Sequence, residues 1–458
     1  MNTTNFQSSN KIRLQFTRAM SDMYQLEVPM YKKLLSLAND VNQNTIKQLS
    51  PLTTSENSLL KLEHHAAIRV GLASELSMIR RLFKVMGMQP VDYYDLSVAG
   101  IPVHSTAFRA LKSNDLEISP FRIFCSLLRL DLIEDKKLQQ QVNTILDKRQ
   151  IFPEELLTLI ELSEKQGGLT QRESDSFIDN ALEVFRWHQN ATVDKHTYDE
   201  LKDAHGLIAD IISFKGPHIN HLTPKVLDID ACQAQFAPHD IKAKADVEGP
   251  PKRDCPILLR QTSFIAIAED VIFTEGKTGT HNARFGEVEQ RGIALTPKGR
   301  ELYDRLLLQA RNTDDQGMPY NIRLSEAFKQ FPDTYDELRR EELAYFHYAS
   351  INSDNINENS NIQLNNIETL ISQDLIKVTP IVYEDFLPVS AAGIFTSNLS
   401  SESKQTKELE TIPMQKENSN REHFEEALGI KVENSFELYK RIQQESLNKA
   451  LKDLSAKL

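Results

Sequence analysis

The sequence has few cysteines, and none of them forms a metal-binding or redox motif. Cys125, Cys232 and Cys255 are its three cysteines, an odd number in separate parts of the chain with no CxxC pair. This pattern excludes a disulfide framework and argues against a thiolate metal site. It predicts buried, reduced thiols and therefore a cytoplasmic location.

Long apolar runs are also missing. No stretch approaches the roughly 20 apolar residues that a membrane-spanning helix needs, and the N-terminal sequence MNTTNFQSSNKIRLQF lacks the apolar core of a secretion signal. We therefore expect neither a membrane partner nor secretion.

Basic charge is not in excess. The formal net charge is −12, which argues against a nucleic-acid partner, because such a partner usually requires a basic face. An anionic small substrate remains possible, since a few arginines in a cleft can override the global sign. The hydrophobic fraction of 40% and the charged fraction of 26% are those of an ordinary globular protein.

Hydrophobic periodicity changes several times along the chain. Residues 62–70 (LEHHAAIRV) are predicted to form a strand, and residues 74–86 a helix that stops at Gly87. Short alternating runs follow, which gives a βαβββ-like order. A similar order returns between residues 218 and 296, after a helical stretch. These patterns predict an α+β fold with a core built from two βαβββ-like modules.

The same patterns divide the chain into six segments, since 458 residues exceed one typical domain. We predict an N-terminal helical segment (1–60), the first half of the core (61–114), a helical insertion (115–215), the second half of the core (216–297), a helical and strand segment that completes the site (298–397), and a polar linker with a C-terminal helical tail (398–458).

The motif HHAAIR at residues 64–69 is the first candidate for chemistry. On a strand, His65 and Arg69 project from one face and His64 from the other. A metal ligand would then lie beside an anion anchor. The alternative is a histidine and an arginine on a solvated strand face.

Two further motifs contain possible metal ligands. In GPHINHLTP, His218 and His221 would face one metal on a helical turn but point oppositely on an extended chain. In RFGEVEQR, Glu287 and Glu289 share one face of a strand, where buried paired carboxylates need a compensating cation. The alternatives are a rigid polar turn and an edge strand with solvated charges. Two imidazoles and one carboxylate form the facial triad expected of non-haem Fe(II).

Four longer motifs carry a family resemblance. HHAAIR, KGPHINHLTPKVLDID, HNARFGEVEQRGIALTPKGRELYD and YEDFLPVSAAGIF, in this order, resemble the 2-oxoadipate dioxygenase/decarboxylase family, a divergent relative of the vicinal oxygen chelate enzymes. The resemblance runs from about residue 60 to residue 400. It implies a curved mixed or antiparallel sheet whose concave side holds the metal.

The resemblance also implies roles for individual residues. His65, His221 and Glu289 resemble the family's metal ligands. Arg69 resembles the residue that anchors the substrate carboxylate and counts among the catalytic residues. Val389 resembles a position that contacts substrate through its backbone, and Ser390 is adjacent to it.

The implied reaction converts 2-oxoadipate and O2 to (R)-2-hydroxyglutarate (D-2-hydroxyglutarate) and CO2, in lysine catabolism, with Fe(II) as cofactor. Zn(II), Ni(II) or another divalent ion can occupy such ligands in purified protein. Two alternatives remain: a glyoxalase-type isomerase or lyase on the same fold, and a non-catalytic metal-binding regulatory protein. The oligomeric state does not follow from the sequence.

Overall fold

The computed structural model describes residues 5–48, 59–312, 317–351, 366–387 and 414–456. These residues form two compact units, each assembled from three stretches of chain. The first unit comprises Met1–Glu248, Gln261–Gln290 and Phe386–Glu433; the second comprises Gly249–Arg260, Arg291–Asp385 and Asn434–Leu458. Within the described ranges, no helix has the length and apolarity needed to span a bilayer.

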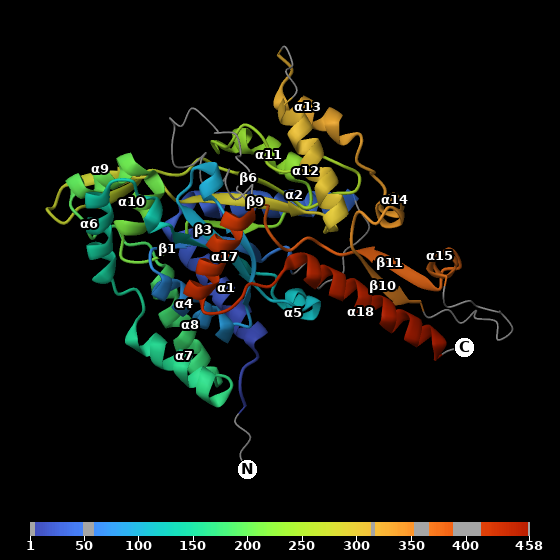
Figure 1. Ribbon diagram of the computed structural model, residues 1–458, viewed down its shortest axis with the longest axis horizontal. Coiled ribbons are helices and arrows are strands. Elements are labelled where there is room, and N and C mark those ends of the chain that lie inside the picture. The colour runs from blue at the N-terminus through green and yellow to red at the C-terminus, as the bar shows by residue number, and fades with distance from the viewer. Residues whose placement is uncertain (1–4, 49–58, 313–316, 352–365, 388–413, 457–458) are drawn as a thin grey trace. The chain divides into compact units, whose positions relative to one another are not determined.

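The largest sheet of the described residues is mixed and seven-stranded, in the order β2-β3-β4-β1-β5-β9-β6 (Figure 1). Its strands are β1 (Glu63–Val70), β2 (Gln89–Asp95), β3 (Val103–Arg109), β4 (Arg122–Leu128), β5 (His221–Pro224), β6 (Leu259–Ser263) and β9 (Phe285–Arg291). Strands β7 (Glu269–Ile272) and β8 (Thr278–His281) pair separately as an antiparallel hairpin.

The sheet contains a partly repeated topology. In the first half, β1 leads through α4 (Ala73–Val85) to the antiparallel strands β2, β3 and β4, and β4 returns parallel to β1. In the second half, β5 leads to α11 (Ile229–Phe236), and β9 returns parallel to β5. The halves join where β1 pairs antiparallel with β5. The first half therefore has the predicted βαβββ order, and the second has one strand fewer in the main sheet.

Helices cover one face of this sheet. They include α1 (Ser9–Glu27), α2 (Pro29–Gln48), α4, α7 (Glu154–Gln166) and α8 (Gln171–Phe185). Their apolar side chains form one buried cluster with alternate residues of the strands, among them Ala66, Ile68, Leu222 and Val288. Because strand side chains alternate between faces, the intervening residues of β1, β5 and β9 point to the opposite face.

Further helices of the first unit are α5 (Ser113–Ile118), α6 (Lys136–Asp147), α9 (Lys195–Ala204), α10 (Gly206–Ile212) and α17 (Met414–Leu428), with short 3-10 turns at Ser97–Ala99, Leu130–Leu132 and Ala237–His239. Helix α10 contacts both α9 and α6 (Figure 1). Tyr24 of α1 places its hydroxyl 3.0 Å from the carbonyl oxygen of Asn220 and 2.8 Å from that of Phe285, which fixes the starts of β5 and β9.

The second unit is mainly helical. It contains α12 (Pro297–Asn312), α13 (Tyr320–Phe328), α14 (Tyr335–Arg340), α15 (Ile367–Ser372) and α18 (Ser435–Ser455), with the antiparallel pair β10 (Phe346–Ser350) and β11 (Ile376–Pro380). Helix α18 packs on β10, where the side chains of Gln443 and Ser446 accept hydrogen bonds from the strand backbone.

Several local predictions are confirmed. The strand expected at 62–70 is β1 and the helix expected at 74–86 is α4. Gly87, with φ of 69°, ends that helix in the left-handed region that glycine adopts readily. The three cysteines are free and buried. One boundary differs, because β4 lies inside the segment predicted to be a helical insertion from residue 115.

Candidate metal centre

The centre begins with His65 on β1. Ala66 and Ile68 point into the helix-covered core, so His65 and Arg69 project from the other face, as the alternation predicts. His65 is fully buried and Arg69 is 4% exposed. The alternative of a solvated histidine and arginine is therefore wrong.

His221 joins His65 because β5 pairs antiparallel with β1, with His221 opposite Ala67. The two imidazole rings meet edge to face at 5.3 Å between centroids, and Phe285 stacks on His221 at 4.8 Å. His218 lies before the strand, and its Nε2 is 3.1 Å from Oδ1 of Asp210 instead. The two histidines of the GPHINHLTP motif therefore serve different groups.

Strand β9 supplies two carboxylates, one on either side of the His65 ring. Oε1 of Glu287 is 3.0 Å from Nε2 of His65, and Oε2 of Glu289 is 2.6 Å from Nδ1. Both glutamates are buried. The expected shared face of these glutamates is confirmed, and solvated charges on an edge strand are excluded.

His65, His221 and Glu287 offer ligand atoms that all lie within 4.8 Å of one another. Neither ring nitrogen of His221 has a hydrogen-bond partner, although the side chain is buried. An unsatisfied buried imidazole costs free energy, and a bound cation would remove that cost. The donor set of two imidazoles and a carboxylate fits a divalent transition metal.

The third ligand predicted from the sequence, Glu289, lies outside this group of three atoms but touches the same histidine. Nη1 of Arg122 is 3.3 Å from its Oε1. Nδ1 of His64 is 3.7 Å from the same oxygen, so the expectation that His64 points away from the face of His65 is wrong. A register shift between Glu63 and His65 interrupts the strand alternation there. Glu287 has different neighbours: its Oε1 accepts hydrogen bonds from Nε2 of Gln261 at 2.6 Å and from the hydroxyl of Thr223 at 3.3 Å. Both carboxylates are therefore held in defined positions.

Electrostatics separate the two histidines. Burial lowers the pKa of His65, but the Glu289 and Glu287 carboxylates outweigh it, so the net pKa is raised. Burial lowers the pKa of His221 well below its ordinary value, and the neighbouring positive charges of His65 and Arg69 lower it further. His221 is therefore a neutral imidazole, the form that binds metals.

Arg69 forms a buried ion pair between its Nη1 and Oδ2 of Asp210, on α10. Arg69 shares a face of β1 with His65, and Ala67, which lies between them, is the residue opposite His221. Lysine would not reproduce this planar arrangement of donors. The predicted anion anchor therefore lies close to the candidate metal ligands, with a carboxylate of the chain already bound to it.

Phe386 closes the site on another side. Its ring is 5.0 Å from the His65 ring and 5.1 Å from that of Phe124, between centroids. The hydroxyl of Tyr94 accepts a hydrogen bond from the backbone N–H of Phe386 at 3.2 Å. Val389 and Ser390, expected to contact substrate, lie outside the described residues.

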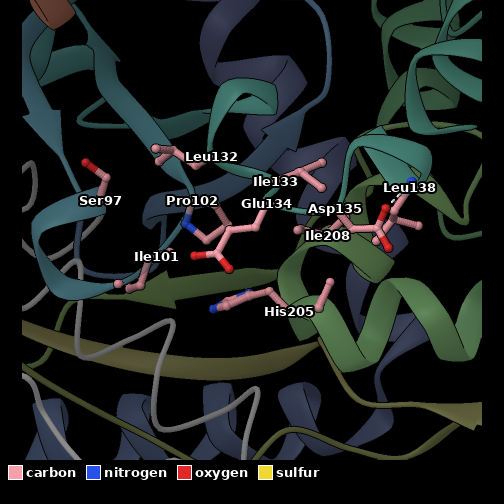
Figure 2. Close-up of a pocket in the computed structure, with 12 residues that line it drawn as sticks. Ser97, Ile101, Pro102, Leu132, Ile133, Glu134, Asp135, Leu138, His205 and Ile208 are labelled. Carbon is pink, nitrogen blue, oxygen red and sulfur yellow. Dashed lines mark hydrogen bonds between the residues drawn. The ribbon is translucent and has the colours of Figure 1, made fainter. Parts of the chain in front are cut away.

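A pocket of about 580 Å³ in the first unit is lined by none of the candidate ligands. Its lining includes Ile101, Leu132, Glu134 and His205, drawn in Figure 2. Burial and then the charge of Arg69 lower the pKa of His205. His205 caps the start of α10, the helix whose Asp210 pairs with Arg69.

Sequence reasoning missed several residues of the centre. Thr223 could have been predicted, because it lies two residues after His221 on the same strand and hence on the same face. No sequence pattern marks the other residues as part of the site, since only the three-dimensional pairing of distant segments brings them there. These residues are Arg122, Asp210, Gln261 and Phe386.

Comparison with known proteins identifies the family of this chain. A family model described as 2-oxoadipate dioxygenase/decarboxylase matches residues 16–398. The chain belongs to the 2-oxoadipate dioxygenase/decarboxylase family. The family predicted from the sequence motifs is therefore confirmed, and with it the class of enzyme.

Individual relatives of this family match over nearly the full chain. A 2-oxoadipate dioxygenase/decarboxylase of Pseudomonas putida is 47% identical over 460 residues, covering 98% of this chain and 97% of the relative. One from Escherichia coli is 48% identical over 444 residues, covering 96% and 97%. The crystal structure of the hydroxyglutarate synthase from Pseudomonas putida in complex with 2-oxoadipate superimposes with a TM-score of 0.86 at 45% identity, covering 98% of this chain and 99% of that one.

Proposed function

We propose that this chain converts 2-oxoadipate and O2 to (R)-2-hydroxyglutarate and CO2 with Fe(II) as cofactor, as a step of lysine breakdown. The observation that carries the proposal is the buried group of two imidazoles and a carboxylate in a chain 47% identical to a 2-oxoadipate dioxygenase/decarboxylase. The reaction balances: the six-carbon acid loses one carbon as CO2, and both oxygen atoms of O2 enter the products.

The metal would be held by His65, His221 and one carboxylate of β9, for which we propose Glu289 from its place in the motif EVEQRG. Bound Fe(II) supplies positions at which a 2-oxo acid and O2 can meet, since a facial triad leaves coordination sites open. The unsatisfied ring nitrogens of His221 support a cation at this place.

The chain's own groups would prepare these ligands. A histidine that binds metal through one ring nitrogen usually donates its other N–H to a carboxylate, which fixes the tautomer and the ring orientation. His65 has a carboxylate at each ring nitrogen. With Glu289 as ligand, Glu287 would orient the ring, and the hydroxyl of Thr223 and the amide of Gln261 would hold Glu287 in turn.

Arg69 would bind the distal carboxylate of the substrate. A guanidinium pairs with a carboxylate through two parallel hydrogen bonds, so it selects dicarboxylic over monocarboxylic 2-oxo acids. Its burial supports this role, because a charge pair is stronger away from water. Val389 and Ser390 remain proposed substrate contacts. The aromatic ring of Phe386 would exclude water from the side of His65 that it covers.

The sheet supports a vicinal oxygen chelate type of fold. Each half contains a pair of parallel strands, β1 with β4 and β5 with β9, and the halves meet at β1 and β5. The candidate ligands come from both halves, as the resemblance implies. Three buried free cysteines support a reducing compartment, and we propose the cytoplasm.

The decisive experiment is anaerobic reconstitution with Fe(II), followed by addition of 2-oxoadipate and air. We expect O2 consumption and formation of 2-hydroxyglutarate and CO2 in equal amounts. Conversion of substrate without O2 consumption would instead support the isomerase or lyase alternative. Metal binding without any conversion would support the regulatory alternative.

A further inference from the structure

Asp210 lies at the centre of a buried polar cluster beside the candidate metal centre. Its Oδ2 binds Nη1 of Arg69 and accepts a hydrogen bond from Nδ2 of Asn220 at 3.2 Å. Its Oδ1 lies 3.1 Å from Nε2 of His218 and 2.9 Å from Nε2 of His281. All five side chains are at most 4% exposed, so one carboxylate organises four groups away from water.

The hydrogen-bond directions in this cluster form a consistent chain. An ionised carboxylate only accepts, so the Nε2–H group of His281 donates to Asp210. The Nδ1 atom of the same ring lies 2.9 Å from the hydroxyl oxygen of Tyr198. Burial raises the pKa of Asp210, but Arg69 and His218 outweigh it, and the net pKa is well below the ordinary value. Asp210 is therefore a fixed negative charge.

Two imidazoles around one carboxylate resemble a metal-ligand set, but a cation does not fit here. The guanidinium of Arg69 already shares the Asp210 carboxylate, and a second cation beside it would be repelled. Within the described residues, the group with metal-site geometry is that of His65, His221 and Glu287. The Asp210 cluster serves Arg69 instead.

The cluster is connected to the candidate metal centre through two segments. Arg69 and His65 project from the same face of β1. Asn220, which binds Asp210, immediately precedes His221. A shift of Asp210 would therefore move the guanidinium relative to the metal ligands. The distance between them decides how long a dicarboxylic acid must be to reach both.

We infer that Asp210 is a positioning residue, which holds the Arg69 guanidinium at the place where the distal carboxylate of a 2-oxo dicarboxylic acid must bind. This inference rests on the proposed function. A guanidinium carries five N–H donors in one plane. One fixed carboxylate therefore sets the orientation of that plane for a second carboxylate. The contacts of Asp210 with His218, His281 and Asn220 keep it in place if the guanidinium of Arg69 moves.

The test uses Asp210→Asn, which keeps the shape and removes the charge. Loss of a hydrogen bond to a charged group corresponds to roughly a 10- to 100-fold change. We expect the KM for 2-oxoadipate to rise by that factor with a much smaller change in kcat. The preference for 2-oxoadipate over 2-oxohexanoate, which lacks the distal carboxylate, should fall by a similar factor. An unchanged KM and an unchanged preference would overturn the inference.

Two further variants separate positioning from structure. Asp210→Glu keeps the charge and displaces it by one methylene group, so we expect a folded protein with a raised KM for 2-oxoadipate; wild-type behaviour of this variant would also overturn the inference. Glu269→Gln is the matched control, because Glu269 carries the same charge and pairs with a different buried guanidinium, that of Arg284, at 2.8 Å. Its substrate preference should stay that of the wild type.

A binding measurement distinguishes this inference from the proposed function. Trp187 is the single tryptophan, and its ring lies 4.7 Å from that of His218, so its fluorescence reports on the cluster. Binding of 2-oxoadipate and 2-oxohexanoate to the Zn(II)-loaded protein needs no turnover. If the wild type prefers the dicarboxylic acid and Asp210→Asn does not, the inference holds even where O2 consumption fails. Equal preference in both proteins would overturn it.

Discussion

Oε2 of Glu289 lies 2.6 Å from Nδ1 of His65, on the side of the ring opposite to Glu287. A metal bound through one nitrogen of His65 would take one of these carboxylates as a ligand and leave the other to accept the remaining N–H. The two assignments use the same residues and exchange the roles of the two glutamates.

Glutamine variants of each residue distinguish these roles. We expect Glu289→Gln to lose stoichiometric iron, because a ligand oxygen with full charge is replaced by an amide. Glu287→Gln should keep the site and weaken metal affinity by about 10- to 100-fold, the usual effect of removing an orienting carboxylate. Iron content and competition with a chelator measure both. Loss of iron in Glu287→Gln, with only weakened affinity in Glu289→Gln, would instead make Glu287 the ligand and Glu289 the orienting carboxylate.

Replacement of Arg69 by lysine should remove substrate discrimination while keeping the positive charge. A point charge lacks the planar pair of donors that matches a carboxylate. We expect kcat/KM for 2-oxoadipate to fall by roughly 10- to 100-fold, with little change for 2-oxohexanoate. Steady-state O2 uptake with both acids provides the measurement. Retained discrimination would remove Arg69 as the anchor of the distal carboxylate.

Metal removal should destabilise the fold around His221. Its two ring nitrogens have no hydrogen-bond partner in the buried site, so binding of an ion adds interactions that the metal-free protein lacks. At an ion concentration of 100 times Kd the stabilisation is about 2.7 kcal/mol. We expect a chelator to lower the Tm of the reconstituted wild type. In His221→Ala, the Tm should not respond to chelator.

Acid should destabilise the first unit through His104. Burial and then the charge of Arg129 lower its pKa from 6.5 to about 3. Other titratable groups that act on it are Asp95, Asp131 and His423. Below the ordinary pKa the unfolded chain binds a proton that the folded protein does not, so stability falls as the pH drops from 6.5 towards 3, by up to about 1.4 kcal/mol per pH unit.

Urea unfolding at a series of pH values checks this prediction. The variant His104→Gln removes the titrating group and should show a shallower loss of stability on acidification. His205 shifts in the same direction, so some dependence should remain. An identical slope in wild type and variant would contradict the assignment to His104.

Gly286 should not tolerate a side chain, because the helices of the core approach β9 closely there. An added Cβ would lie 2.5 Å from Cε1 of Phe264 and 2.8 Å from side-chain atoms of both Tyr31 and Leu34. Overpacking of this kind costs about 1–3 kcal/mol. We expect Gly286→Ala to lower the free energy of unfolding. The double variant with Phe264→Leu should recover part of it, since the nearest atom is then removed.

Strand alternation explains why much of the site was predictable. It placed His65 with Arg69, and Glu287 with Glu289, because the period of two is a property of every strand. The choice between the two glutamates does not follow from alternation, since both share a face. Asp210 escaped prediction because a carboxylate in an amphipathic helical stretch looks like a solvated charge until the fold buries it.

The strand β4 escaped prediction for a related reason. All seven residues of Arg122–Leu128 are buried, so the segment lacks the polar alternation of a half-exposed strand. A short, fully buried strand cannot be told from a buried helix by periodicity alone. The arginine at its start gave no sign of being buried, because its partner Glu289 is 167 residues away along the chain.

The antiparallel contact of β1 with β5 has a consequence for how the protein acquires activity. His65 and Glu289 are separated by 224 residues, so neither half of the sheet alone holds a complete set of ligands. Contacts between such distant segments slow folding, because the chain must close a long loop before it gains them. A metal ion at this site would therefore meet its full set of candidate ligands only after the two halves of the sheet have paired through β1 and β5.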